Sequence, residues 1–177
     1  MKTNQISKSK EKTFSFVKKH VYDRIGFEFT NFLINNESRE YEACTFEMDG
    51  LKVISRSAKI TPTKTGQFVT LWKRSAGEPI QPYDVADDFD LVVINVAKDN
   101  HLGQFVFPKS VLLKQQIISS DEKEGKRGFR VYPPWDVTMN KQAQKSQKWQ
   151  LDYFLFADLT KSIDSGRANK LYFRNNR

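Results

Sequence analysis

Cysteine and histidine, which proteins often use for zinc binding and nucleophilic catalysis, are scarce in this chain of 177 residues. Cys44 is the single cysteine, so no disulfide can form within the chain, and we expect a cytoplasmic location. Its place in a strand-like run predicts a buried thiol rather than a nucleophile. The two histidines, His20 and His101, lie far apart and lack the spacing of metal ligands.

Long apolar runs and glycine-rich loops are missing as well. The longest apolar run, Leu91–Val96, has the length of a strand, whereas a membrane-spanning helix needs about 20 residues. The 8 glycines form neither a P-loop nor a dinucleotide-binding motif, and there is no Gly-x-Ser-x-Gly elbow. Residues 1–12 are basic but lack the apolar segment of a signal peptide. We expect a flexible basic N-terminus over residues 1–12 and one domain over residues 13–177.

Acidic residues are absent from the stretch Leu51–Arg74, which belongs to a chain with a formal net charge of +8. The stretch carries six cations: Lys52, Arg56, Lys59, Lys64, Lys73 and Arg74. Valine, isoleucine, threonine and aromatic residues separate them, which predicts β-structure rather than a solvated tail. Unbalanced cations on an ordered sheet repel one another, and a bound phosphate backbone would relieve that repulsion. The stretch therefore predicts a surface for nucleic acid or another phosphate-rich ligand.

The apolar pattern predicts a single domain of the α/β (α+β) class, with a central mixed sheet flanked by helices. Phe14, Val17 and Val21 have helical spacing, and we expect this helix to resume after Gly26 and run to Leu33. The remaining elements are expected as strands at Gln67–Lys73, Leu91–Ala97, Gly103–Phe107 and Phe129–Tyr132, and as helices at Pro108–Gln116 and Lys141–Leu159.

Asp49-Gly50 is a favoured two-residue turn and predicts a hairpin between Tyr41–Met48 and Leu51–Ile60. In that register Met48 lies opposite Leu51, and Cys44 lies opposite Ser55.

Carboxylates near the next strands suggest an alternative, a Mg²⁺-dependent nuclease with a restriction-endonuclease-like core. Asp88 and Asp90 precede the apolar strand, Gln104 stands on the following strand where a second acid is expected, and Glu47 is a further candidate acid. Paired carboxylates would hold Mg²⁺, with Asp90 as the metal ligand. The neutral Gln104 and the absence of a lysine two residues later favour the architecture over the activity.

Aromatic and basic residues recur together in Lys126–Trp135, where Arg130 and Tyr132 alternate, and in the last helix, where Lys148 precedes Trp149. Bases stack on exposed aromatic rings, and cations bind the backbone, which together favour a single-strand binder. Single-stranded DNA is the favoured ligand, with RNA left open. The candidate binding residues are Arg56, Lys59, Lys64, Trp72, Lys73, Arg74, Lys109, Arg130 and Trp135. A third alternative is a regulatory protein that binds a nucleotide or a phosphorylated small ligand.

Five motifs resemble the MepB family, which is named after a gene beside a staphylococcal multidrug efflux pump and its repressor. These motifs are Arg56–Lys64, Gly66–Arg74, Gly103–Lys109, Phe129–Trp135 and Gln147–Gln150. The resemblance implies that residues 13–177 form a MepB-like domain with a nuclease-like α/β fold that binds nucleic acid. It also implies a bacterial cytoplasmic protein linked to multidrug resistance, and it supplies no established catalytic mechanism.

Overall fold

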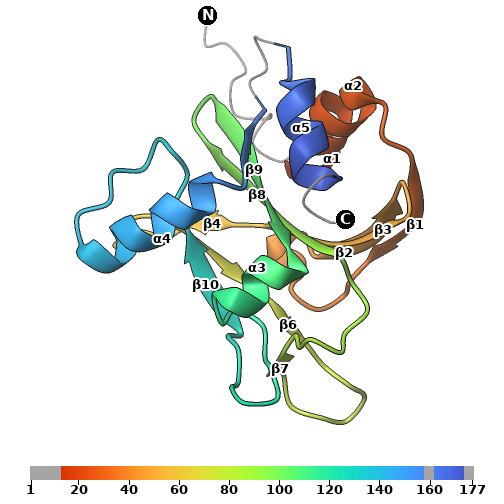
Figure 1. Cartoon of the computed structure of the whole chain (residues 1–177), viewed down its shortest axis with the longest axis vertical. Helices are drawn as coiled ribbons and strands as arrows, with labels where there is room; N and C mark the ends of the chain where they lie inside the picture. Colours follow the sequence, from red (N-terminus) through yellow and green to blue (C-terminus); the bar gives the residue numbers. More distant parts are fainter. Residues whose placement is uncertain (1–12, 158–161, 174–177) are drawn as a thin grey trace, which may run out of the picture.

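A six-stranded mixed sheet forms the centre of the computed structural model, which describes residues 13–157 and 162–173 (Figure 1). The predicted flexible segment 1–12 lies outside the described residues. In spatial order the strands are β1 (Phe29–Ile34), β2 (Cys44–Met48), β3 (Leu51–Ser57), β8 (Leu91–Lys98), β9 (His101–Pro108) and β11 (Phe154–Phe156). Neighbouring strands are antiparallel except β3 and β8, which run parallel.

The β2–β3 hairpin has the predicted register. Asp49 and Gly50 both have positive φ angles, 47° and 83°, which the right-handed twist of a two-residue hairpin favours. Met48 pairs with Leu51, and Cys44 pairs with Ser55. Cys44 is buried as predicted, and burial raises the pKa of its thiol to about 11, so the thiol is protonated at neutral pH.

Side chains cover both faces of the central sheet, because alternate residues of each strand enter different cores. Val93 belongs to the first core, and its neighbours Val92 and Ile94 belong to the second. The first core lies against the helical segments of the two chain ends, which gather on one side of the sheet (Figure 1). These segments are α1 (Thr13–Val17), a π-helical turn (Lys18–Tyr22), α2 (Asp23–Ile25) and α5 (Ser165–Tyr172).

The second core is closed by α3 (Lys109–Lys114), α4 (Lys141–Leu151) and a smaller sheet. The smaller sheet contains, in order, β10 (Gly128–Val131), β5 (Gln67–Thr70) and β4 (Lys59–Ile60). A two-stranded ribbon of β6 (Trp72–Lys73) and β7 (Gln81–Pro82) follows, and a 3-10 turn (Arg39–Tyr41) precedes β2. The predicted strand over residues 67–73 is therefore split between two sheets.

Two helix predictions are wrong because strand pairing outweighs helical apolar spacing. The first helical segment ends at Ile25, and Gly26 at a φ of 76° turns the chain into β1, which pairs with β2 along the sheet edge. The last predicted helix ends at Leu151, after which β11 pairs with β9 at the opposite edge. The predicted fold class, one mixed α+β domain with a central mixed sheet and flanking helices, is confirmed.

Within the described residues, no helix combines the length and the apolar character needed to cross a bilayer.

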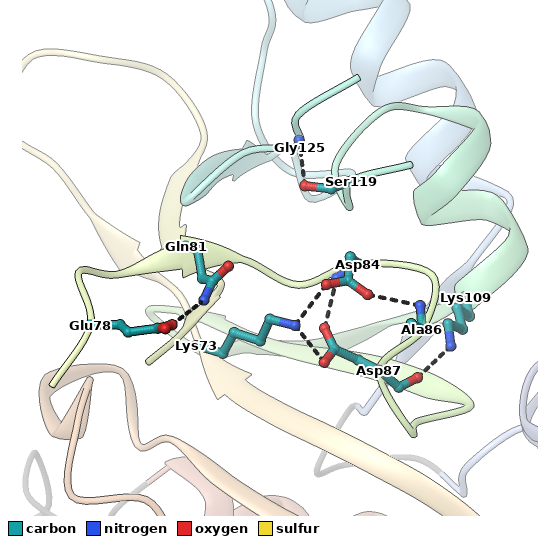
Figure 2. Close-up of polar contacts among 9 residues, drawn as sticks. All are labelled: Lys73, Glu78, Gln81, Asp84, Ala86, Asp87, Lys109, Ser119 and Gly125. Carbon is teal, nitrogen blue, oxygen red and sulfur yellow. Dashed lines mark hydrogen bonds and ion pairs between the residues drawn. The ribbon is translucent and has the colours of Figure 1, made fainter. Parts of the chain in front are cut away.

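Gly125 fixes the loop that leads into β10. A Cβ atom at this position would lie 2.6 Å from the carbonyl oxygen of Ile117, and the Gly125 amide donates to Ser119 Oγ at 2.8 Å (Figure 2). Because backbone atoms cannot move aside as a flexible side chain can, Gly125→Ala is expected to lower the free energy of unfolding by about 1–3 kcal/mol. Chemical denaturation would measure the change.

Gly166→Ala is the matched control. An added Cβ in this helix would meet Asp164 Oδ1 at an ordinary 3.4 Å, so the substitution should raise stability by about 0.5–1 kcal/mol. Equal effects of the two substitutions would contradict the close backbone approach at Gly125.

Candidate functional site

Lys73 points into an acidic segment of the chain. Its Nζ atom lies 2.7 Å from Asp84 Oδ2 and 2.6 Å from Asp87 Oδ1 (Figure 2). Burial by itself would lower the pKa of Lys73, but hydrogen bonds to the two carboxylates raise it above its ordinary value. The hydrogen bond from Lys73 in turn lowers the pKa of Asp84, against the opposing effect of burial. Lys73 therefore holds the acidic segment in place and is already neutralised.

Arg56 is buried, so the prediction of an exposed cation at this position is wrong. Its side chain is 2% exposed, and Nη1 donates to the Ser55 carbonyl oxygen at 2.9 Å. Burial lowers the pKa of the guanidinium, while the nearby Tyr83 hydroxyl opposes this effect. No carboxylate of the described residues forms an ion pair with Arg56, and its Nε atom has no hydrogen-bond partner there.

Two further cations of the predicted surface are paired. Lys52 forms an ion pair with Asp88, and Arg74 forms one with Glu37 at 3.1 Å. The Arg74 guanidinium also lies 5.6 Å from the centre of the Trp72 ring. Of the six cations of the stretch 51–74, Arg56 is therefore buried and Lys52, Lys73 and Arg74 are paired with acids, whereas the sequence led us to expect cations that are not balanced by acids.

Lys59, Lys109 and Trp135 also make local contacts. The Lys59 Nζ atom lies 4.8 Å from the centre of the Tyr41 ring, and Lys109 Nζ donates to the backbone oxygen of Asp87 (Figure 2). The Trp135 ring stacks on His101 with a centroid distance of 5.1 Å and an interplanar angle of 15°. One face of Trp135 is therefore already covered.

The candidate carboxylates do not fit a Mg²⁺ site. Asp90 Oδ2 accepts a hydrogen bond from the Lys52 backbone at 2.8 Å, and Asp88 pairs with the Lys52 side chain. The hydrogen bond and the charge of Asp88 raise the pKa of Lys52, and the charges of Glu47 and Asp90 act in the same direction. These three acids therefore interact with the Lys52 ammonium group. Among the described residues, no three His, Cys, Asp or Glu side chains lie close enough together to hold a metal.

Gln104 lies far from those acids. It pairs with Asn95, five residues along β8 from Asp90, or roughly 17 Å at about 3.4 Å per residue. Its amide is fully buried, donates to Tyr22 Oη and Asn95 Oδ1 at 2.9 Å each, and accepts from Tyr172 Oη at 3.0 Å. Gln104 is therefore part of a buried hydrogen-bond network that joins the central sheet to helical segments from both ends of the chain.

A basic pocket with a volume of about 660 Å³ is lined by residues of the loop 61–66, β10 and α4. Its cations are Lys64, Lys126 and Arg130, and none of its lining side chains is a carboxylate. No acid of the described residues forms an ion pair with these three cations. In the basic pocket, a concave surface of the described structure therefore meets cations that form no ion pair. Its other lining residues include Phe129, Tyr132, Asn140, Gln142, Trp149 and Gln150.

Arg130 holds one wall of the basic pocket. Its guanidinium donates to Thr61 Oγ1 at 2.8 Å, to the Gly66 oxygen at 3.2 Å and to the Thr65 oxygen at 3.5 Å. These bonds fix both ends of the loop that carries Lys64. The loop thus presents Lys64 from a fixed position.

Gln150 connects α4, which also lines the pocket, to β10. Its side-chain amide accepts from the Tyr132 backbone at 2.8 Å and donates to the Arg130 carbonyl at 2.9 Å, so it pairs with β10 as a strand would. Asn140 is the N-cap of α4, and its side-chain oxygen accepts a hydrogen bond from the Ala143 amide at 2.8 Å. The helix contains no acid and exposes three lysines: Lys141, Lys145 and Lys148.

The structure brings together two of the nine predicted binding residues, Lys64 and Arg130, in the basic pocket. Lys126 is not among the nine, although it begins the basic and aromatic run that the sequence shows. Its signal is the alternation of positions 126, 128, 130 and 132 along β10 and its flanking residues, all of which line the pocket. Helix α4 gives a second signal, since its basic residues are not balanced by a single acid.

The fold is that of a MepB-like protein, as two comparisons show. Residues 35–156 match the MepB-like family. A crystal structure of MepB superposes with a TM-score of 0.72 at 35% sequence identity, covering 82% of this chain and 96% of that chain. The chain belongs to the MepB-like family, which confirms the resemblance found in the sequence.

A more distant likeness is to the structure of a bacterial homing endonuclease, I-Ssp6803I. It has a TM-score of 0.43 at 17% identity and covers 81% of this chain and 92% of that chain. A likeness at this level assigns neither a site nor an activity. No curated protein matches the chain.

The ion pairs of Lys73 predict a defined pH dependence. Because folding raises the pKa of Lys73, this residue contributes its full stabilisation at pH values below 10.5, its pKa in the unfolded chain. Because folding lowers the pKa of Asp84, that residue contributes its full stabilisation at pH values above 3.8. Lys73→Met should therefore lower the free energy of unfolding by about 1–3 kcal/mol between about pH 5 and pH 9. The difference from the wild type should shrink as the pH falls below 3.8 or rises above 10.5.

Denaturant titrations across pH would test this dependence, with Lys52→Met as the control. Lys52 pairs with a largely exposed carboxylate, so its removal should cost less. A difference that stays constant down to pH 2 would contradict the assignment.

Gln104 is expected to act in folding rather than in catalysis. Gln104→Met keeps the volume but deprives Tyr172 and Asn95 of a partner, so it should lower stability by about 1–3 kcal/mol. Gln144→Met, on the exposed surface of α4, should change stability by less than about 0.5 kcal/mol. Thermal unfolding measures both variants, and unchanged stability in Gln104→Met would refute the role of the buried network.

Proposed function

We propose that this chain binds single-stranded nucleic acid through the basic pocket. The observation that carries the proposal is the convergence of Lys64, Lys126 and Arg130 on a pocket whose lining contains no carboxylate. Elsewhere, cations such as Lys52, Lys73 and Arg74 are already paired with acids. A phosphate backbone is a ligand that offers several negative charges at once, and binding it releases counterions.

Helix α4 extends the basic surface beyond the pocket. Lys141, Lys145 and Lys148 follow one another at helical spacings of four and three residues, so they form one exposed stripe beside the side that lines the pocket. A strand whose phosphates enter the pocket could continue along this stripe. An unpaired strand suits the pocket better than a duplex, because a duplex keeps its bases inside the stack.

A nucleotide or phosphorylated small ligand is the second candidate. The volume of about 660 Å³ lies within the range of roughly 300–1,000 Å³ that small-molecule sites occupy. Competition distinguishes the two, since a mononucleotide ligand would bind without any gain in affinity from a longer strand.

The proposed binding takes place in the cytoplasm, which suits a chain whose only cysteine is buried and free. A link to multidrug resistance stays a prediction from the family resemblance. Mg²⁺-dependent cleavage is not part of the proposal, because Asp88, Asp90 and Gln104 do not fit a metal site.

Single substitutions test the binding of phosphates by the pocket cations. Lys64→Ala and Lys126→Ala should each weaken binding to a single-stranded oligonucleotide and reduce the slope of log K against log salt by about 0.7 for each phosphate that the variant no longer neutralises. Fluorescence anisotropy at several salt concentrations measures both quantities.

Lys170→Ala is the matched control, because it removes the same charge from the exposed surface of α5, on the other side of the central sheet (Figure 1). It should leave the affinity and the salt slope nearly unchanged. Binding that does not respond to salt, or that weakens equally in all three variants, would refute the proposal.

A further inference from the structure

Two aromatic side chains from different elements line the basic pocket, Tyr132 after β10 and Trp149 on α4. The two tryptophans expected to stack on bases, Trp72 and Trp135, are engaged by Arg74 and His101. Tyr132 and Trp149, in contrast, line a pocket together with cations that form no ion pair within the described structure.

The loop 61–66 packs against the Tyr132 ring and restricts its position. Gly66 packs so closely on its ring that an added Cβ would lie 2.7 Å from both Cδ1 and Cε1. The Tyr132 backbone is fixed by Gln150, and its half-buried ring lines the pocket. The ring thus has one side closed by the loop 61–66 and is prevented from turning away.

Trp149 is anchored in the second core. Its ring lies 5.3 Å from that of Phe107 at an angle of 46°, and the half-buried side chain also lines the pocket. Phe129, which is 7% exposed, adds apolar surface to the pocket lining. The pocket therefore combines aromatic walls with cations.

An unpaired nucleotide combines the same two properties, since it has a flat base that stacks on aromatic rings and a charged phosphate. Resting on the proposed function, we propose that the basic pocket holds one unstacked base against Tyr132 and Trp149, while Lys64, Lys126 and Arg130 bind the adjoining phosphates. The ligand class is thus a base-bearing strand rather than any polyanion, and affinity has a base-dependent part that salt does not remove.

An abasic strand separates the two parts of the affinity, because it keeps the phosphates and lacks the bases. The probes are a mixed-sequence single-stranded DNA of about 12 nucleotides and the same strand with abasic residues in its central half. Wild-type protein should bind the unmodified strand more tightly, by about 5- to 150-fold for each base stacked, with similar salt slopes for the two probes. This comparison needs no variant.

Tyr132→Leu should lower the affinity for the unmodified strand towards the affinity for the abasic strand. The affinity of this variant for the abasic strand should be nearly unchanged, which also shows that the variant is folded. Tyr132→Phe keeps the ring and should retain the preference. Lys64→Ala should weaken the binding of both probes by the same factor, because it removes a contact to phosphate.

Three outcomes would overturn the inference. Equal wild-type affinity for the two probes, with a salt slope that depends on Lys64, would leave the proposed function standing and remove the base contact. If Tyr132→Leu lost the same amount of affinity for both probes, Tyr132 would only shape the pocket and would not contact a base. Failure of the wild type to bind either probe would remove the proposed function and, with it, the inference.

Discussion

The parallel pairing of β3 with β8 is the constraint on which the rest of the structure depends. Two adjacent parallel strands cannot be joined by a tight turn, so the chain between them must cross one face of the sheet. Here the crossover contains β4, β5, β6 and β7 together with the acidic segment that follows. Because β10 then pairs with β5, the crossover becomes a second sheet that closes the second core and provides one wall of the basic pocket.

The same crossover decides which charges are available to a ligand. It contains four of the six cations of the stretch 51–74, because Lys52 and Arg56 lie on β3 itself, and it also contains the carboxylates of the segment 84–90. Folding brings several of these charges into contact. Lys73 is neutralised by Asp84 and Asp87, and Lys52 by Asp88. The net charge of +8 is therefore not spread evenly, and unpaired cations remain around the loop 61–66, β10 and α4. Burial and ion pairing thus leave Lys59 and Lys64 as the cations of that stretch that are exposed and without an ion pair within the described residues, and Lys64 lines the basic pocket.

Buried polar groups account for residues that otherwise suggest a reactive centre. The amide of Gln104 stands on a central strand, where a nuclease of this outline would carry an acid, yet all three of its hydrogen bonds are made to Tyr22, Asn95 and Tyr172. Polar groups in a core must find partners inside the protein, because water cannot reach them. Satisfying these groups also ties the helical segments of the two chain ends to one sheet, which gives the network a structural purpose.

Much of the fold could be predicted from local signals. The Asp49-Gly50 turn determined the register of its hairpin, and the apolar run from Leu91 predicted a central strand that is buried throughout the run. The motifs were also sufficient to identify the family. Segments at the two sheet edges could not be predicted in this way. Phe29–Ile34 and Phe154–Phe156 have apolar spacings compatible with a helix, and they become strands because β2 and β9 offer unpaired edges.

The candidate site, like the fold, could be predicted from the sequence only in part. Composition established that the chain is basic, and the order of its residues established that Arg130, Tyr132 and Trp149 occur near lysines. Only the tertiary structure decided that Arg56 is buried, that Lys73 is paired, and that Lys64 and Lys126 meet at one pocket. The physical reason is that hydrogen bonds and apolar periodicity along a strand are local, whereas burial and ion pairing depend on residues that are distant in sequence and become neighbours only when the chain folds.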